Sequence, residues 1–501
     1  MSQLSKFVNE IVANAVIIKN CSLDELKELS RKDEIKTEYG SSCYLSKVLS
    51  RSAKKTEIIN GQLSEKNQET LRRVANILKG KKLIQTDAAI ATGKRSIPCR
   101  IYIPEEYARI AYIWKTLLFE SKEKKPKIVL LFVPGWPEIS VLVDINSYIT
   151  VGLGIDYAGE AKMASLRLAM YYAKQKGGLG LHAGSKVLML KKGPKGEIKE
   201  KGILLFGLSA TGKTTLTCHT HRLDIKKGEG IKIKQDDISF LWKDGSCSGT
   251  EKNFYIKTEG IDNVSQPMIY EALTRKNTIL ENVYVKNGHV DFQNYELTTN
   301  GRAVIERELL PFTDKSIDMK KVDVVLFITR RNTIVPPIAK LNNEHATTFF
   351  MLGESIETSA GDPKHAGEPV HVVGMDPFIV GLRDREGNRF YEFIKKNKIT
   401  CYLVNTGYFG QTKKSNGEKI TIEDTITFIT EAIRGNVRWK KDGFWGYYIP
   451  RKIKGIELSR FDWQRYYSKN EYLELNQKLK EERLNWLKQF KKLKKKIIPW
   501  I

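Results

Sequence analysis

The residues with the clearest chemistry lie in the stretch KGILLFGLSATGKTTLT, residues 201–217. The apolar run 203–206 is typical of a short buried strand, and Gly207 is followed after four residues by the triplet Gly-Lys-Thr at 212–214. This is the phosphate-loop spacing G-x-x-x-x-G-K-[ST], placed between a strand and the start of a helix. In such a loop, glycines let backbone N–H groups turn inward around phosphate oxygens, and the helix N-terminus adds partial positive charge. The stretch therefore predicts a nucleotide-binding site.

Two side chains of this loop would act directly on a bound nucleotide. Lys213 would reach the outer phosphates, and the Thr214 hydroxyl would hold a divalent metal. The loop residues expected to contact the nucleotide are Gly207, Leu208, Ser209, Ala210, Thr211, Gly212, Lys213, Thr214 and Thr215. The alternative is a turn rich in glycine and threonine that binds no ligand.

The loop lies in a chain whose patterns alternate between helices and short strands, as in a mixed α/β protein. Helices are expected at 22–32, 63–80, 105–120, 159–174, 422–434 and 470–490. The second of these carries Leu71, Val74, Ile77 and Leu78 on one stripe, which predicts a buried face. Short apolar strands dominate 82–155 and recur after the loop. A boundary near residue 200 predicts an N-terminal α/β domain (1–200) and a C-terminal nucleotide-binding domain (201–501).

The composition limits the classes of function. The chain has 501 residues, 41% hydrophobic and 28% charged, with a formal net charge of +26. No apolar run approaches the ~20 residues that span a bilayer, and the first residues lack the basic start and apolar segment of a secretory signal. Six scattered cysteines without CxxC spacing favour reduced thiols, so we expect a cytoplasmic protein without membrane contact. No zinc-finger or RNP-like motif accompanies the basic charge, so no specific nucleic-acid partner is expected.

Several segments around the loop follow one known order. YAGE and a lysine (157–162) come first, then a glycine-rich segment with one histidine, the loop itself, and an Asp-Asp pair at 236–237. QPMIYEAL, LENV, VLFITRRNTIVPPIAKL, CYLVNTGYFG and GEKITIEDT continue the order. Together they resemble ATP-dependent phosphoenolpyruvate carboxykinase over residues 85–475. The resemblance implies an N-terminal α/β domain and a mobile C-terminal domain that carries the loop, with the active site between them, and it favours a monomer.

The activity implied by the resemblance has two stages. Oxaloacetate loses CO₂, and the resulting enolate attacks the γ-phosphate of ATP to form phosphoenolpyruvate, a step of gluconeogenesis. Mg²⁺ or Mn²⁺ would serve as cofactor. The resemblance makes His182, Thr214 and Asp237 the metal ligands, and a carboxylate is the hard ligand that such ions prefer.

The resemblance also implies residues for substrate and nucleotide. Arg95 would bind the substrate carboxylate, and Arg302 would contact both the substrate and the γ-phosphate, since a guanidinium bonds oxyanions bidentately. Lys94 competes with Arg95 for its role, and Tyr157 would lie next to the substrate. The residues given a catalytic role are Lys213, Arg302, Arg95 and Lys162, and those expected at the nucleotide beyond the loop are Gln266, Lys419, Ile420 and Thr425.

The sequence departs from the family pattern at several of these positions. Met163 stands where the second lysine of the YAGE helix ligates metal, and a thioether is a poor ligand for Mg²⁺ or Mn²⁺. The histidine segment reads HAGSK instead of HCSAN, and Gln266 and Lys419 replace Glu and Arg. Three hypotheses therefore stand. The first is an ATP-dependent carboxykinase with an altered metal site, and the second is a small-metabolite kinase of the same fold without decarboxylation. The third is a basic ATP-binding protein that acts on nucleic acid or as a regulator.

Overall fold

The computed structural model describes residues 2–50, 53–192, 196–208, 211–357, 367–494 and 497. The chain divides into two compact units, each formed from separated stretches of sequence. Unit 1 comprises Met1–Lys176 and Thr250–Thr313, and unit 2 comprises Gly177–Gly249 and Asp314–Ile501. Residue 200, the boundary expected from the sequence, lies within a strand of unit 2, β11 (Glu197–Gly207). No helix among the described residues is both long and apolar enough to span a membrane.

Unit 1 contains a seven-stranded and a five-stranded sheet. The larger has the order β1 (Val16–Lys19), β5 (Lys82–Ile90), β6 (Ile97–Pro104), β7 (Ile128–Val133), β9 (Ile149–Leu153), β8 (Ser140–Asp144) and β4 (Thr56–Ile59). The smaller has the order β15 (Phe254–Lys257), β19 (Arg302–Ile305), β16 (Ile279–Glu281), β3 (Ser42–Tyr44) and β2 (Ile35–Lys36). The strands β17 (Tyr284–Lys286) and β18 (His289–Asp291) form a separate two-stranded sheet in the same unit.

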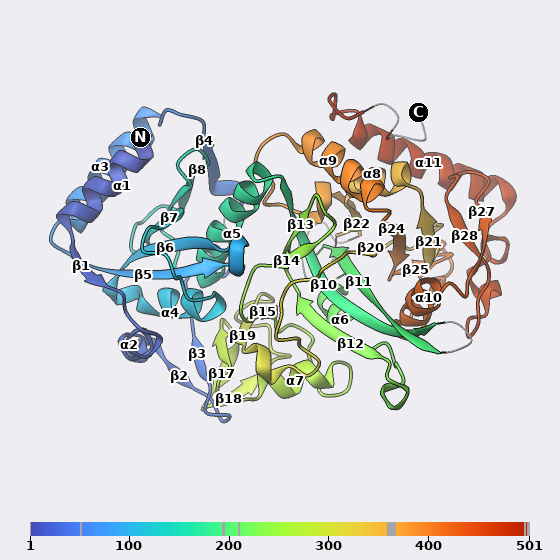
Figure 1. Cartoon of the computed structure of the whole chain (residues 1–501), viewed down its shortest axis with the longest axis horizontal. Coiled ribbons are helices and arrows are strands. Elements are labelled where there is room, and N and C mark those ends of the chain that lie inside the picture. Colours follow the sequence, from blue (N-terminus) through green and yellow to red (C-terminus); the bar gives the residue numbers. More distant parts are fainter. Residues whose placement is uncertain are drawn as a thin grey trace. The chain divides into compact units, whose positions relative to one another are not determined.

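Helices cover the larger sheet of unit 1. They are α1 (Gln3–Asn14), α2 (Leu23–Leu29), α3 (Glu65–Leu78), α4 (Ala108–Leu117) and α5 (Ala158–Gln175), with α7 (Pro267–Leu273) beside β19. Helices α1 and α3 lie side by side (Figure 1), and their apolar residues share one core with alternate residues of the strands. Leu71, Val74 and Leu78 are buried as expected, but Ile77 is 56% exposed, so its place in the apolar stripe was predicted wrongly. The apolar face of α3 is narrower than the sequence suggests.

Unit 2 is organised around a ten-stranded sheet. Its order is β14 (Cys247–Gly249), β13 (Ile238–Trp242), β10 (Gly178–Lys192), β11, β20 (Val324–Thr329), β24 (Thr400–Asn405), β21 (Ile338–Leu341), β28 (Tyr448–Lys452) and β27 (Arg438–Lys441), and β12 (Gly230–Gln235) also pairs with β10. The antiparallel pair β10 and β11 forms the long hairpin drawn in green in Figure 1. The helices are α6 (Lys213–Cys218), α8 (Asn343–Leu352), α9 (Arg383–Lys396), α10 (Ile422–Arg434) and α11 (Lys469–Leu487). Two separate two-stranded sheets pair β22 (Glu354–Ile356) with β23 (Pro369–His371) and β25 (Tyr408–Phe409) with β26 (Glu418–Lys419).

The strands β11, β20 and β24 form a parallel block in the middle of this sheet. Gly207 at the end of β11 pairs with Ile328, and Thr329 at the end of β20 pairs with Asn405. The carboxyl ends of three neighbouring strands therefore meet at one edge, which is where open α/β sheets bind ligands. The core below this edge is aromatic, with Phe350 and Phe390 stacked at 4.4 Å between ring centroids.

Candidate functional site

The phosphate loop connects β11 to α6 at this edge of unit 2. Gly212 has φ +94°, in the left-handed region that favours glycine, and directly precedes Lys213, the first residue of α6. A Cβ at Gly207 would collide with the hydroxyl of Thr211, which donates to the carbonyl of Leu208 at 2.8 Å. Glycine is therefore needed at 212 for its left-handed backbone conformation and at 207 because a side chain would collide with Thr211. Two of the expected cofactor contacts, Ser209 and Ala210, lie outside the described residues.

Neighbouring elements hold this loop in place. The Thr406 hydroxyl, just after β24, donates to the carbonyls of Thr211 and Thr329 at 2.9 and 3.2 Å. Within α6, Thr217 donates to the carbonyl of Lys213 at 2.8 Å. Thr214 and Thr215 lie in the first turn of the helix and are partly buried. The carboxyl ends of the parallel strands β20 and β24 therefore hold the loop in place.

Sheet pairing brings His182 and Asp237 to the lysine of the loop. Strand β10 pairs antiparallel with β13 and sets His182 opposite Ile238, so that Asp237 lies next to the imidazole. His182 Nε2 is 3.0 Å from Asp237 Oδ1, and Lys213 Nζ is 3.2 Å from the same oxygen. Three residues separated by up to 55 positions in sequence thus meet at one point.

The hydrogen bonds and burial of His182 determine how its ring can act in this group. His182 Nδ1 lies 2.6 Å from the carbonyl oxygen of Met375, so Nδ1 carries a hydrogen and donates it. Burial, followed by the positive charge of Lys213, lowers the pKa of His182 and favours the neutral ring. The Lys213 ammonium compensates the charge of the Asp237 carboxylate at 3.2 Å. An imidazole beside a carboxylate is also a donor set that suits Mn²⁺ or Mg²⁺.

Asp376 is a further acidic residue near this group, and the sequence reasoning did not select it. Its side chain is buried and accepts a hydrogen bond from the backbone N–H of Phe378 at 2.8 Å. Burial, aided by the negative charges of Glu386 and Asp237, raises the pKa of Asp376 to about 7. Asp376 follows Met375, the partner of His182, and no local pattern in the sequence marks it.

The remaining expected nucleotide contacts belong to different elements. Lys419 is exposed on β26, opposite Tyr408 of β25. Ile420 is buried and its N–H donates to the carbonyl of Gly407 at 3.0 Å. Thr425 is buried in α10, where its hydroxyl donates to the carbonyl of Thr421 at 2.9 Å. Gln266 belongs to unit 1, where it is the N-cap residue of α7.

Asn300 joins two expected substrate residues within unit 1. Its side-chain oxygen accepts from Arg302 Nη2 at 2.8 Å, and its Nδ2 lies 3.3 Å from the hydroxyl of Tyr157. The same Nδ2 donates to the carbonyl of Leu49 at 2.8 Å, which fixes the amide orientation. The sequence reasoning missed Asn300, although it stands two residues before the selected arginine.

Tyr255 links Arg302 to Lys162. The guanidinium carbon of Arg302 is 5.8 Å from the centre of the Tyr255 ring, and Lys162 Nζ is 5.5 Å from it. The Tyr255 hydroxyl donates to Glu281, whose other oxygen accepts the backbone N–H of Ala158 at 2.8 Å, at the start of α5. Tyr157, Lys162 and Arg302 are therefore gathered around one buried aromatic ring.

Lys162 itself is held inside unit 1. It is 2% exposed and its Nζ lies 3.3 Å from Glu251 Oε1. Arg95, by contrast, is partly exposed at the end of the short 3₁₀ turn Gly93–Arg95, next to the exposed Lys94. Both basic residues of this turn thus stay candidates for the substrate role.

Comparison with known proteins decides the family. The family model for phosphoenolpyruvate carboxykinase matches residues 15–459. The chain belongs to the phosphoenolpyruvate carboxykinase family. It is 36% identical to phosphoenolpyruvate carboxykinase (ATP) of Aeropyrum pernix over 406 residues, which are 80% of each chain. It is 26% identical to the protein of the same name from Rhizobium meliloti over 428 residues, 80% of this chain and 76% of the relative. The α/β fold expected from the sequence is confirmed as that of this family.

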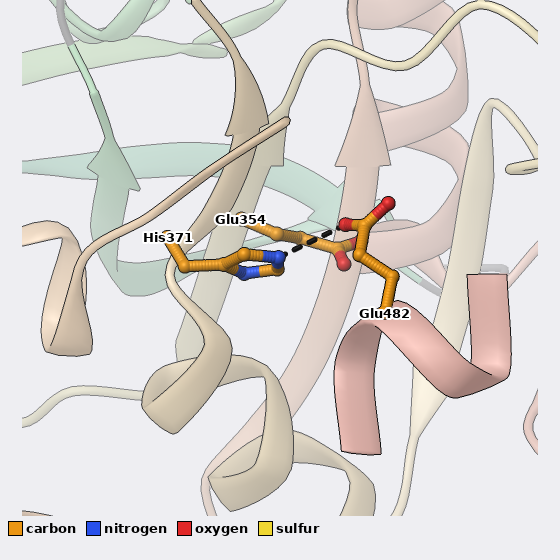
Figure 2. A group of neighbouring side chains, drawn as sticks. All are labelled: Glu354, His371 and Glu482. Carbon is orange, nitrogen blue, oxygen red and sulfur yellow. Dashed lines mark hydrogen bonds and ion pairs between the residues drawn. The ribbon is translucent and has the colours of Figure 1, made fainter. Parts of the chain in front are cut away.

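Unit 2 of this carboxykinase-family chain holds a second group of acidic and imidazole side chains (Figure 2). Glu354, His371 and Glu482 come from β22, β23 and α11, and their ligand atoms lie within 4.8 Å of one another. Arg483 donates to both oxygens of Glu354 at 2.6 and 2.8 Å, and Arg331 Nη2 lies 3.3 Å from Glu354 and 2.5 Å from Glu482. Since two guanidinium groups neutralise the two carboxylates, this group is an ion network that ties α11 to β22.

Proposed function

We propose that this chain is an ATP-dependent phosphoenolpyruvate carboxykinase, which converts oxaloacetate and ATP to phosphoenolpyruvate, CO₂ and ADP in gluconeogenesis. The observation that carries the proposal is the meeting of Lys213, His182 and Asp237 beside the phosphate loop. A phosphate-binding lysine next to a metal-type donor pair is the arrangement that phosphoryl transfer from a metal–nucleotide complex requires. The names of the curated relatives agree with this reading.

The roles of the nucleotide-side residues follow from this proposal. The loop residues Gly207–Thr215 surround the phosphates, and Lys213 neutralises the oxygens of the group being transferred. His182, Asp237 and the Thr214 hydroxyl hold the divalent ion. When bound, Mg²⁺ or Mn²⁺ supplies positive charge to the phosphates.

The proposed nucleotide base site is further along unit 2. Ile420 and Thr425 contact adenine and ribose, with Lys419 beside them. Lys419 is exposed and would bind the base more weakly than an arginine, because a lysine side chain has no planar group that can stack on it. Gln266 is the proposed nucleotide contact from unit 1.

The substrate-side roles fall to residues of unit 1. Arg95 binds the substrate carboxylate, and Arg302 binds both substrate and the γ-phosphate, because a guanidinium stays charged and bonds oxyanions bidentately. Asn300 orients Arg302 and Tyr157 toward their ligands. Lys162 adds positive charge that stabilises the enolate after CO₂ has left, and Glu251 holds its ammonium in place.

The direct test is to incubate the purified chain with oxaloacetate, ATP and Mn²⁺ and to measure phosphoenolpyruvate and CO₂. We expect both products in equal amounts, dependent on metal. If the chain binds ATP but forms no phosphoenolpyruvate, the carboxykinase proposal is wrong. ATP consumption with other small hydroxylated or carboxylated metabolites would then identify the kinase alternative.

We further propose a cytoplasmic monomer without a specific nucleic-acid partner. Sedimentation tests the monomer, and salt-dependent binding assays test for a nucleic-acid partner.

Met163 leads to a prediction about the metal. Replacing Met163 with lysine should tighten Mn²⁺ binding by about tenfold, because an amine is a far better ligand for this ion than a thioether. Free Mn²⁺ measured by electron paramagnetic resonance during a titration checks this without any turnover. Met163→Leu is the matched control, since it removes the sulfur at nearly constant volume and should leave the affinity unchanged. Equal affinities in Met163→Lys and Met163→Leu would show that this position does not reach the ion.

A further inference from the structure

A lysine is buried beneath the helix of the phosphate loop. Lys186 stands on β10 and is 0% exposed. Its Nζ donates to the carbonyl of Leu216, lies 2.7 Å from His221 Nε2, and lies 3.4 Å from the carbonyl oxygen of His219. Burying an ammonium group costs desolvation free energy. A fully buried lysine that contacts carbonyls and an imidazole is therefore expected to have a specific role.

These contacts are made at the C-terminal end of α6. The helix has six residues and ends at Cys218, so the carbonyl of Leu216 is one of the last four, which lack a partner within the helix. A lysine ammonium there satisfies the carbonyl and opposes the negative end of the helix dipole. So short a helix does not persist by itself and depends on its surroundings. Since α6 begins at Lys213, its far end sets where the loop lysine and Thr214 stand.

His221 connects Lys186 to helix α10. Its backbone has φ +57°, and its N–H donates to His219 Nδ1 at 2.9 Å, which closes a tight turn after α6. Because Nε2 accepts from Lys186, the neutral ring has its hydrogen on Nδ1 and donates it to the hydroxyl of Thr430, 3.0 Å away. Burial, followed by the positive charge of Lys186, keeps the pKa of His221 well below its ordinary value and so keeps the ring neutral.

Thr430 belongs to α10, the helix whose Thr425 is the proposed contact to the base. The hydrogen bonds therefore form one chain from α6 through Lys186 and His221 to α10, entirely within unit 2. The two ends of this chain are the elements that carry the proposed phosphate and base contacts of one nucleotide. Burial also lowers the pKa of Lys186 to about 7. The polar groups that contact its Nζ are the carbonyls of Leu216 and His219 and the imidazole of His221.

We propose that Lys186 is a positioning residue for the nucleotide: it fastens the end of α6 to α10 through His221 and Thr430 and thereby holds Lys213 and Thr214 at the phosphates. The inference rests on the proposed ATP binding. It deepens that proposal by assigning a role to a lysine that contacts neither substrate nor metal. The role predicts an effect on ATP and none on oxaloacetate.

The test compares Lys186→Met with the wild-type chain. Methionine keeps the length of the side chain but cannot donate, so we expect the dissociation constant of a fluorescent ATP analogue and the KM for ATP to rise about tenfold, while the KM for oxaloacetate stays unchanged. Circular dichroism and thermal unfolding establish that the variant is folded.

A second pair of variants tests the connection without removing a charge. Thr430→Val should weaken ATP binding about threefold. Thr427→Val, one turn earlier on α10, should not, because the Thr427 hydroxyl donates to the Glu423 carbonyl of its own helix. Lys186→Met combined with Thr430→Val should bind no worse than Lys186→Met alone, because both changes interrupt one chain.

The outcomes separate the two proposals. Unchanged ATP affinity in folded Lys186→Met, or equal affinities in Thr430→Val and Thr427→Val, would overturn the positioning role and leave the carboxykinase proposal standing. A Lys186→Met chain that does not fold leaves the threonine pair to decide. Failure of the wild-type chain to bind the ATP analogue would remove the basis of both.

Discussion

Lys213→Met is expected to lower kcat for phosphoenolpyruvate formation about a thousandfold, with a smaller change in the KM for ATP. The ammonium lies 3.2 Å from Asp237 Oδ1 and directly follows the left-handed Gly212, which places it at the start of the loop helix. Charge on the transferring phosphoryl group develops most strongly in the transition state, and one preorganised cationic donor is worth ~10²–10³ or more in kcat.

The measurement for Lys213→Met is single-turnover formation of phosphoenolpyruvate at saturating ATP, which separates chemistry from product release. Lys201→Met is the matched control. Lys201 lies on β11, toward the opposite end of the strand from the loop, and its ion pair with Asp323 spans 3.3 Å. Both variants lose one lysine charge, so a comparable fall in kcat for both would show that general electrostatics, and not the loop lysine, supports catalysis.

Arg483→Met is expected to lower the free energy of unfolding of unit 2 by about 3–5 kcal/mol. Arg483 is 0% exposed and is bonded to both oxygens of Glu354, itself 0% exposed. Its guanidinium also lies over the Trp445 ring, 4.4 Å from the centre. The variant leaves a buried carboxylate with only part of its compensation, from Arg331, and it removes this packing. Urea unfolding followed by fluorescence measures the loss.

The control for the network is an exposed ion pair of the same unit. Lys232 and Glu200 are 2.6 Å apart with side chains 36% and 57% exposed, so Lys232→Met should change stability by less than about 1 kcal/mol. Losses of similar size in Lys232→Met and Arg483→Met would contradict a special role for the buried network.

The same network predicts an acid-sensitive stability. Burial by itself would raise the pKa of Glu354, but Arg483 and Arg331 outweigh burial and hold that pKa at about 2. A carboxyl group with a lowered pKa contributes stability that is fully present above its ordinary pKa of 4.5 and is lost as the pH falls toward 2. Unfolding free energies measured between pH 5 and pH 2 should therefore fall more steeply for the wild-type chain than for Arg483→Met.

Features that depend on neighbours in sequence could be predicted from the sequence. Helix α10 runs over Ile422–Arg434 as expected, because helical periodicity is local. The glycines of the phosphate loop have the backbone roles that their spacing implies. By contrast, the apolar stretch TILENVYV (278–285) reads as a single strand but contains two, β16 and β17. They are interrupted at Asn282, which has φ +57° and whose side-chain oxygen accepts the backbone N–H of Ser46.

Features that depend on contacts between distant residues could not be derived from local patterns. The resemblance named His182 and Asp237, but only the β10–β13 register brings them together. The roles of Asn300 and Asp376 likewise depend on contacts with residues far away in the sequence, each within its own unit.

The sequence by itself determined the α/β character and the family, and it predicted a phosphate-binding role for the loop. These are carried by residue types at short, regular spacings, and the comparisons confirmed the family and the fold. The tertiary structure decided which buried charges meet: Lys213 with Asp237, Lys162 with Glu251, and Lys186 with His221. A charge can be buried only where a partner offsets its desolvation, and the strand pairing and helix packing of the whole unit supply that partner.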